Sequence, residues 1–214
     1  MTVTAIPDFP AVLAEAIRVL TLGRALSPAQ AGSLSRRTDT GFLIGELASG
    51  PRDAAPFAAE ADAEGRIGNA FPDTLPADAP VLHAAVLAAR PDAGGVVLLR
   101  APRLAAWGLS ARALPVRYFQ MFGYTRAQEI PVAPARPEQV KAVLAANTDT
   151  PALLLEDGRT LIWAPQPARA VRLVLSLEEA AQVTAIADRL GGAKDYPAEA
   201  REKIYLSLQA QARR

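Results

Sequence analysis

The sequence of 214 residues contains no cysteine and a single histidine, His83. The absence of cysteine excludes disulfides, thiolate nucleophiles and the cysteine-ligated zinc and iron–sulfur sites. With one histidine, no site with two or three histidine ligands can form within one subunit. Carboxylates remain as metal ligands, but such sites favour Mg²⁺, Ca²⁺ or Mn²⁺.

The chain also lacks an excess of either charge and lacks a long apolar stretch. Lysine and arginine total 23 against 22 for aspartate and glutamate, which gives no electrostatic case for binding nucleic acid or an anionic membrane. The N-terminus has no basic region followed by an apolar core, so we expect no signal peptide. No uncharged apolar stretch approaches membrane-spanning length. We therefore expect a soluble, cytoplasmic protein with no nucleic-acid partner and no membrane partner.

Half of the residues are hydrophobic, which is ample for a core, and the centre of the chain is the stretch of residues 76–107. Asp78 predicts the start of a helix, and Arg90, which precedes a proline, predicts its end. Residues 96–99 form a short apolar run typical of a strand covered on both faces. Arg100 follows directly. The end of a buried strand is where α/β proteins usually place their chemistry.

Other patterns predict helices and hairpins on both sides of this stretch. In order, we expect an extended arm over residues 1–9, a helix ending near residue 23, hairpins over 34–44 and 57–68, a short edge strand over 129–132, a helix over 138–147, a hairpin over 152–163, a long helix over 167–190 and a C-terminal helix within 193–214. Residues 118–124 are rich in aromatic side chains, which usually fill a core or a subunit contact. No repeat or linker divides the chain, so we expect residues 1–214 to form a single domain.

Two segments share a frame with a known family. Residues 76–79 read Pro-Ala-Asp-Ala and precede His83 by three residues, and residues 97–102 read Val-Leu-Leu-Arg-Ala-Pro. Residues 154–158 read Leu-Leu-Glu-Asp-Gly. This frame resembles the class II aldolase/adducin family, whose members run PSSE-xxx-H, then a strand ending in His-x-His, and later LLxxHG. The resemblance implies an α/β fold, namely a three-layer α/β/α domain with a mainly antiparallel central sheet. It also implies a homo-oligomer, with a tetramer favoured.

The residues that carry the family's chemistry differ in this chain. Enzymes of the family cleave or epimerise small sugar phosphates with a zinc ion, and the resemblance places its histidine ligands at Leu98, Arg100 and Asp157. Leu98 has no ligand atom, the cation Arg100 repels a metal, and Asp157 alone is no site. The catalytic glutamate falls at Ala79, which cannot move a proton. The sequence therefore predicts no metal, no cofactor and no catalytic residue of the zinc mechanism.

A further segment, residues 29–37, resembles the family's phosphate-binding sequence GTAGNISxR. Gly32, Ser35 and Arg37 fit that pattern, while Ser33 stands in place of the asparagine. Gly45 stands in place of a threonine, so a phosphate site here would lose side-chain donors at two positions. An ordinary hairpin is the other interpretation of this segment, and the one we favour.

Two functional hypotheses follow. The first is a catalytically degenerate protein that acts in small-metabolite binding or in assembly. Its pocket for a small anionic metabolite would consist of Ser33, Arg37, Asp78, Arg100 and Asp157. The alternative is a metal-independent lyase or isomerase for a small sugar phosphate or oxo acid, in which Arg100 replaces the metal, since a guanidinium can stabilise an enolate. Nothing in the sequence fixes the base that this alternative needs.

Two side chains carry more specific expectations. We expect His83 to be a half-buried helix residue that donates to a nearby carbonyl and has a structural role. We also expect Arg100 and Asp157 to form an ion pair, with the guanidinium and the carboxylate within about 4 Å. The reason is that an anion and a cation at two former ligand positions can replace the metal.

Overall fold

The structure, a computed structural model, describes residues 8–27, 31–48, 57–68 and 75–212. Most of the arm predicted over residues 1–9 therefore lies outside the described residues. The helices are α1 (Phe9–Leu22), α2 (Ala79–Ala89), α3 (Pro102–Leu109), α4 (Pro137–Ala146), α5 (Pro167–Arg189) and α6 (Ala198–Ala212), with a 3-10 helix, η1 (Phe119–Gly123). The strands are β1 (Gly32–Arg37), β2 (Gly41–Leu47), β3 (Ala58–Asp62), β4 (Gly95–Leu99), β5 (Leu114–Pro115), β6 (Glu129–Ile130), β7 (Val132–Ala133), β8 (Ala152–Leu155) and β9 (Thr160–Ala164).

The main sheet has seven strands in the order β3-β2-β1-β4-β9-β8-β7, while β5 and β6 pair separately. Every neighbouring pair in the main sheet is antiparallel except β7 with β8. All five residues of β4 are buried, as expected for a strand covered on both faces. The predicted α/β fold with a mainly antiparallel central sheet is confirmed.

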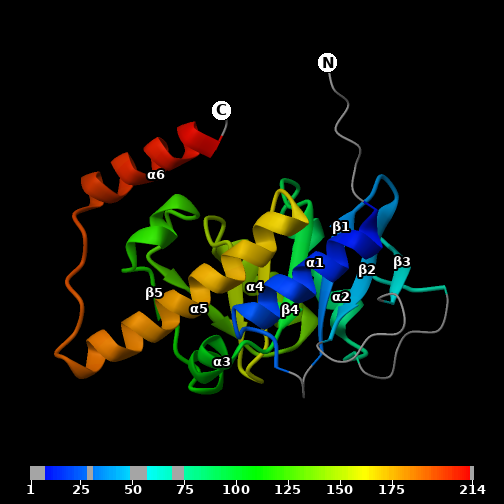
Figure 1. The fold of residues 1–214 in the computed structure, drawn as a ribbon, viewed down its shortest axis with the longest axis horizontal. Helices are drawn as coiled ribbons and strands as arrows, with labels where there is room; N and C mark the ends of the chain where they lie inside the picture. The colour runs from blue at the N-terminus through cyan, green and yellow to red at the C-terminus, as the bar shows by residue number, and fades with distance from the viewer. Residues whose placement is uncertain (1–7, 28–30, 49–56, 69–74, 213–214) are drawn as a thin grey trace.

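Helices cover both faces of this sheet (Figure 1). Because side chains alternate along a strand, Val97 and Leu99 of β4 join the core that includes α1, α3 and α5. Val96 and Leu98 join the core formed with α2 and α4. Burying each such side chain contributes about 1.5–3 kcal/mol, so β4 is held from both sides. Arg100 follows the last of these buried residues.

A proline divides the edge strand that we predicted over residues 129–132. The structure has two short strands there, β6 and β7, with Pro131 between them. Proline has no N–H to donate and a fixed φ, so the ladder does not continue through it. As a result β6 pairs with β5, whereas β7 pairs in parallel with β8 at the edge of the main sheet.

A buried carboxylate from α5 caps α3, the helix that follows Arg100. The N–H groups of Arg103 and Leu104 donate to Glu178 Oε1 at 2.9 and 2.8 Å. Glu178 is 2% exposed, and burial raises its pKa above the ordinary value in spite of these hydrogen bonds. The first N–H groups of a helix have no partner within it, so a carboxylate at this end stabilises α3. The contact joins α3 to α5 and so fixes the path of the chain beyond Arg100.

The C-terminal helix α6 lies apart from the main sheet and packs on η1 (Figure 1). Gln209 of α6 donates to the carbonyl of Gly123 at 3.0 Å. Within η1, Phe122 is buried, whereas Phe119 is 50% exposed. The aromatic segment therefore supplies part of the core, and its contribution to a subunit contact remains a prediction. In the part of the chain that the structure describes, no helix is long and apolar enough to cross a membrane.

Candidate functional site

Charged side chains meet beyond the end of β4. Arg100 follows β4, Asp78 stands just before α2, and Asp157 and Arg159 lie in the tight turn between β8 and β9. Gly158 makes that turn possible, because its φ of +85° lies in the region that other residues rarely adopt. A side chain at Gly158 would also press on Arg100, whose Nε lies 3.4 Å from an ideal Cβ there.

Arg159 holds the two carboxylates of this cluster together. Its two terminal nitrogens, Nη1 and Nη2, each donate to one oxygen of Asp78 at 2.7 Å, which is the bidentate geometry of a strong pair. Its Nε donates to Asp157 Oδ2, also at 2.7 Å. The backbone N–H of Arg159 donates to Asp157 Oδ1 at 3.0 Å. We call the three residues Asp78, Arg159 and Asp157 the Arg159 bridge; it connects the β8–β9 turn to the start of α2.

Within the Arg159 bridge the Arg159 side chain is 12% exposed, whereas those of Asp78 and Asp157 are 33% and 34% exposed. Burial alone would lower the pKa of Arg159, but the hydrogen bonds to Asp78 and Asp157 raise it above its ordinary value. Burial acts to raise the pKa of Asp157, but the side-chain and backbone hydrogen bonds from Arg159 bring it below the ordinary value. At neutral pH the Arg159 guanidinium is therefore protonated and the Asp157 carboxylate is deprotonated.

The predicted ion pair between Arg100 and Asp157 is wrong. The Arg100 guanidinium donates from Nη2 to the main-chain carbonyl of Asp157 at 2.8 Å, and the carboxylate of Asp157 pairs with Arg159 instead. Arg159 is two residues away in the same turn, so less chain entropy is lost in forming that pair. Arg100 itself is exposed, next to the bridge.

Of the five predicted pocket residues, Asp78, Arg100 and Asp157 are brought together. Ser33 pairs with Leu98 near the end of β4 but is buried, and Arg37 lies elsewhere. Arg37 donates to the carbonyls of Leu87, Arg90 and Ala93 at 2.6–2.9 Å, at the end of α2 opposite to Asp78. Its guanidinium therefore closes the C-terminus of α2. Ser33 is fully buried under α2. Residues 32–37 pair with β2 as the predicted hairpin, and the absence of a phosphate site there stays a prediction.

His83 is the buried partner of two serines. Its Nε2 lies 2.8 Å from Ser33 Oγ and its Nδ1 lies 2.7 Å from Ser35 Oγ. The structural role predicted for His83 agrees with this, but the predicted carbonyl partner and the half-buried position are wrong, since the residue is 0% exposed. Ser33 and Ser35 are two residues apart in β1, so both side chains lie on the face that meets α2, and both hydroxyls reach the ring. Burial lowers the pKa of His83 to about 3, so the imidazole is neutral.

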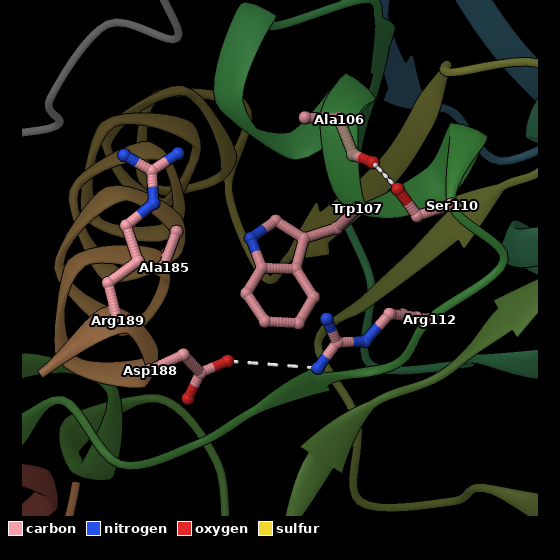
Figure 2. Close-up of a pocket in the computed structure, with 7 residues that line it drawn as sticks. All are labelled: Ala106, Trp107, Ser110, Arg112, Ala185, Asp188 and Arg189. Atoms are coloured by element: carbon pink, nitrogen blue, oxygen red, sulfur yellow. Dashed lines mark hydrogen bonds and ion pairs between the residues drawn. The ribbon is translucent and has the colours of Figure 1, made fainter. Parts of the chain in front are cut away.

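Several cavities among the described residues lie away from the Arg159 bridge. One of about 370 Å³ lies between α3 and α5, with the Trp107 indole between Arg112 and the end of α5 (Figure 2). Arg112 stands over that indole at 5.2 Å and reaches Asp188 at 3.7 Å. A second cavity, of about 550 Å³, lies between α5, η1 and α6. Neither cavity is lined by Asp78, Arg159 or Asp157.

No metal site is present in the described ranges, where no three histidine, cysteine, aspartate or glutamate side chains are close enough to hold an ion. Asp78 and Asp157 are the carboxylates of the cluster beyond β4, and both are engaged by Arg159. A dication placed there would face a guanidinium, so these residues do not fit a zinc ion.

Most of the chain matches a known family. The model of the class II aldolase and adducin N-terminal domain matches residues 11–185. The chain belongs to the class II aldolase and adducin family. The matched segment runs from α1 to within α5, so the Arg159 bridge lies inside the family domain and α6 lies outside the match.

Solved structures of the class II aldolase fold superpose on nearly the whole chain. An L-fuculose 1-phosphate aldolase has a TM-score of 0.74 at 18% identity, covering 96% of this chain and 98% of its own. The L-fuculose-1-phosphate aldolase of Thermus thermophilus has a TM-score of 0.64 at 23% identity, with 86% and 97% covered. An aldolase II superfamily protein of Pseudomonas syringae has a TM-score of 0.66 at 18% identity, with 94% and 84% covered. No curated protein sequence matches the chain.

Proposed function

We propose that this chain is a class II aldolase-fold protein that has lost the zinc chemistry of the family. It acts in the binding of a small anionic metabolite or in assembly. One observation carries the proposal: the Arg159 guanidinium lies between the carboxylates of Asp78 and Asp157, with three of its nitrogens 2.7 Å from their oxygens. A positive charge from the protein itself thus pairs with both acids beside the end of β4.

The chemistry of the ligand positions supports the same proposal. In the family frame, Leu98, Arg100 and Asp157 stand at the ligand positions, and Ala79 stands at the position of the glutamate. Leu98 and Ala79 are buried hydrocarbon side chains, so neither supplies a metal ligand or an acid. Catalytic zinc needs three protein ligands, and only Asp157 carries a ligand atom that suits it.

An assay of aldol cleavage tests the proposed loss of catalysis. The purified chain is incubated with L-fuculose 1-phosphate, with and without added zinc, and aldehyde release is followed. We expect no turnover above the buffer control in either condition. Zinc-dependent turnover that disappears in the Asp157→Ala variant would overturn the proposal.

Arg100 supports the binding role, because its guanidinium is exposed and donates to a main-chain carbonyl, not to a carboxylate. A thermal-shift screen with sugar phosphates and 2-oxo acids tests it. We expect stabilisation by at least one anionic compound, weakened in Arg100→Gln and retained in Arg136→Gln, which removes the same charge from a site before α4. An equal loss in both variants would assign the effect to net charge alone.

The same position of Arg100 favours the alternative function, a metal-independent lyase or isomerase. An exposed guanidinium at the end of a buried strand can stabilise an enolate oxygen. The carboxylates nearby are poor bases for such a reaction, because Arg159 holds both in hydrogen bonds. Metal-independent turnover of a sugar phosphate or an oxo acid that is lost in Arg100→Gln would favour this alternative.

A further inference from the structure

A cavity beneath α6 contains arginines that lack a carboxylate partner among the described residues. We call it the α6 cleft; it has a volume of about 550 Å³ and lies between the first half of α5, η1 and α6. Its lining includes Arg169, Arg172, Tyr124, Phe119, Gln120 and Leu208. Drug-sized and metabolite-sized ligands occupy pockets of roughly 300–1,000 Å³, so the cleft has room for one.

Within the described part of the chain, no acidic side chain lines the α6 cleft. Among the same residues, neither Arg169 nor Arg172 has a carboxylate within ion-pair distance. Arginines on neighbouring surfaces differ: Arg117 pairs with Asp195 at 2.7 Å, and Arg126 pairs with Glu202 at 2.6 Å. Arg169 also borders a neighbouring cavity lined by Asp92 and Asp149, but among the described residues neither carboxylate is within ion-pair distance of it. Both arginines of the α6 cleft therefore lack a carboxylate partner in the described part of the chain.

The two guanidiniums share one side of α5. Arg169 and Arg172 are three residues apart, a spacing that places both side chains on the same helix face. Arg169 is half-buried and stands over the Tyr124 ring at 5.8 Å, a cation–π contact that limits where its guanidinium can point. Each guanidinium is planar and offers N–H donors that match a phosphate or a carboxylate.

Apolar and aromatic groups occupy the other walls. Phe119 is 50% exposed, and Leu208 reaches the cleft from α6. Gln120 adds a side-chain amide. A ligand with an anionic group at one end and a flat apolar ring at the other fits this combination, because the ring covers Phe119 while the anion meets the arginines.

We infer that the α6 cleft binds a small phosphorylated molecule that carries a flat ring. Arg169 and Arg172 hold the phosphate, and Phe119 and Leu208 contact the ring. The cleft uses residues of α5, η1 and α6, whereas the Arg159 bridge uses the β8–β9 turn and the start of α2. The inference therefore goes beyond the proposed function and does not depend on the loss of zinc chemistry.

Calorimetric titration of the full chain with phenyl phosphate and with inorganic phosphate tests the inference. We expect phenyl phosphate to bind more tightly than inorganic phosphate, because only the former covers the aromatic wall. The Arg169→Gln/Arg172→Gln double variant should lose at least about tenfold in affinity, since charge-assisted hydrogen bonds are removed. Phe119→Ala should reduce the preference for phenyl phosphate and leave the affinity for inorganic phosphate unchanged.

Matched variants separate this site from general electrostatics and from the proposed function. Arg189→Gln removes the same charge from the other end of α5, outside the cleft, and should change the affinity less than about twofold. Arg136→Gln, at an exposed position before α4 and outside both the cleft and the Arg159 bridge, should also leave phenyl phosphate binding intact. Thermal unfolding of each variant verifies that it is folded. No binding of either probe by the unmodified chain up to about 10 mM, or an unchanged affinity in the folded double variant, overturns the inference.

Discussion

At the scale of single residues, Arg159 engages both carboxylates that lie beyond the end of β4. It makes a bidentate contact to Asp78 and a further contact to Asp157, and its side chain is 12% exposed. Both acids could be named from the sequence, whereas the base between them was missed. The signal was present, because an arginine two positions after the aspartate of a tight Asp-Gly turn lies close to that aspartate. The resemblance to the family places Arg100, and not Arg159, at a ligand position.

Replacing Arg159 tests the importance of the bridge for stability. Arg159→Leu leaves two partly buried carboxylates without their partner, and we expect a loss of about 2–3 kcal/mol in the free energy of unfolding. Urea unfolding followed by circular dichroism measures it. The matched control is Arg100→Gln, which removes one exposed contact and should cost less than about 1 kcal/mol. Equal losses in the two variants would contradict the role given to Arg159.

His83 makes the stability of the fold depend on pH. Its pKa is about 3 in the folded chain and 6.5 is its ordinary value, so the unfolded chain binds a proton that the folded chain does not. The stability that His83 contributes is therefore present above pH 6.5 and is lost as the pH falls toward 3, by up to about 1.4 kcal/mol per pH unit. Urea unfolding at several values between pH 7 and 5 measures this slope.

The control for His83 is the His83→Gln variant, which keeps an amide that can hydrogen bond to the serines but does not titrate. We expect its stability to depend on pH less steeply than that of the unmodified chain. The raised pKa of Glu178 acts in the opposite direction in both proteins, so it cancels from the difference between their slopes. Parallel slopes would show that His83 is not the titrating group.

At the scale of secondary structure elements, local patterns predicted most of what the structure contains. The hairpin around the Asp157-Gly158 turn, the buried strand β4 and the long helix α5 lie where turn residues and apolar runs placed them. Pro131 marks the limit of that approach. The sequence indicates that an edge strand is present there. Only the tertiary pairing shows that the segment before the proline, β6, and the segment after it, β7, belong to different sheets.

The capping of α3 is a second feature that local patterns do not contain. Glu178 lies 74 residues after Leu104 in the sequence, so no local spacing connects them. Glu178→Ala should cost about 1–3 kcal/mol, because the N–H groups of Arg103 and Leu104 lose their acceptor. Glu178→Gln keeps an acceptor oxygen and loses only the negative charge. It should therefore cost less than about 1 kcal/mol, which is the typical contribution of a charge at a helix N-terminus. Thermal unfolding of the pair of variants measures this, and an equally small loss in both would contradict the capping role.

At the scale of the whole molecule, the order of elements carried more information than individual residues. The frame of spacings in the sequence was enough to predict the sheet and its helices, and the fold is shared with structures of 18–23% identity. The reason is that burial on both faces of β4 requires only apolar side chains of suitable size. A chemical site requires particular atoms, which such a frame does not determine.

Assembly is the prediction at this scale that remains to be measured. The expectation rests on the aromatic content of residues 118–124 and on the resemblance to the family. We expect a homo-oligomer, with a tetramer favoured. Light scattering coupled to gel filtration at micromolar concentration gives the mass directly. A monomer under those conditions would reject the prediction.

Zinc content is the most direct measure of the central claim, which is that Arg159 pairs with the carboxylates at the end of β4 and that no zinc ion binds there. The chain is purified in the presence of zinc, washed with a chelator and subjected to elemental analysis. We predict much less than one zinc per chain, because Leu98 and Arg100 supply no ligand and Asp157 is held by Arg159. About one zinc per chain that survives the chelator wash would contradict the account.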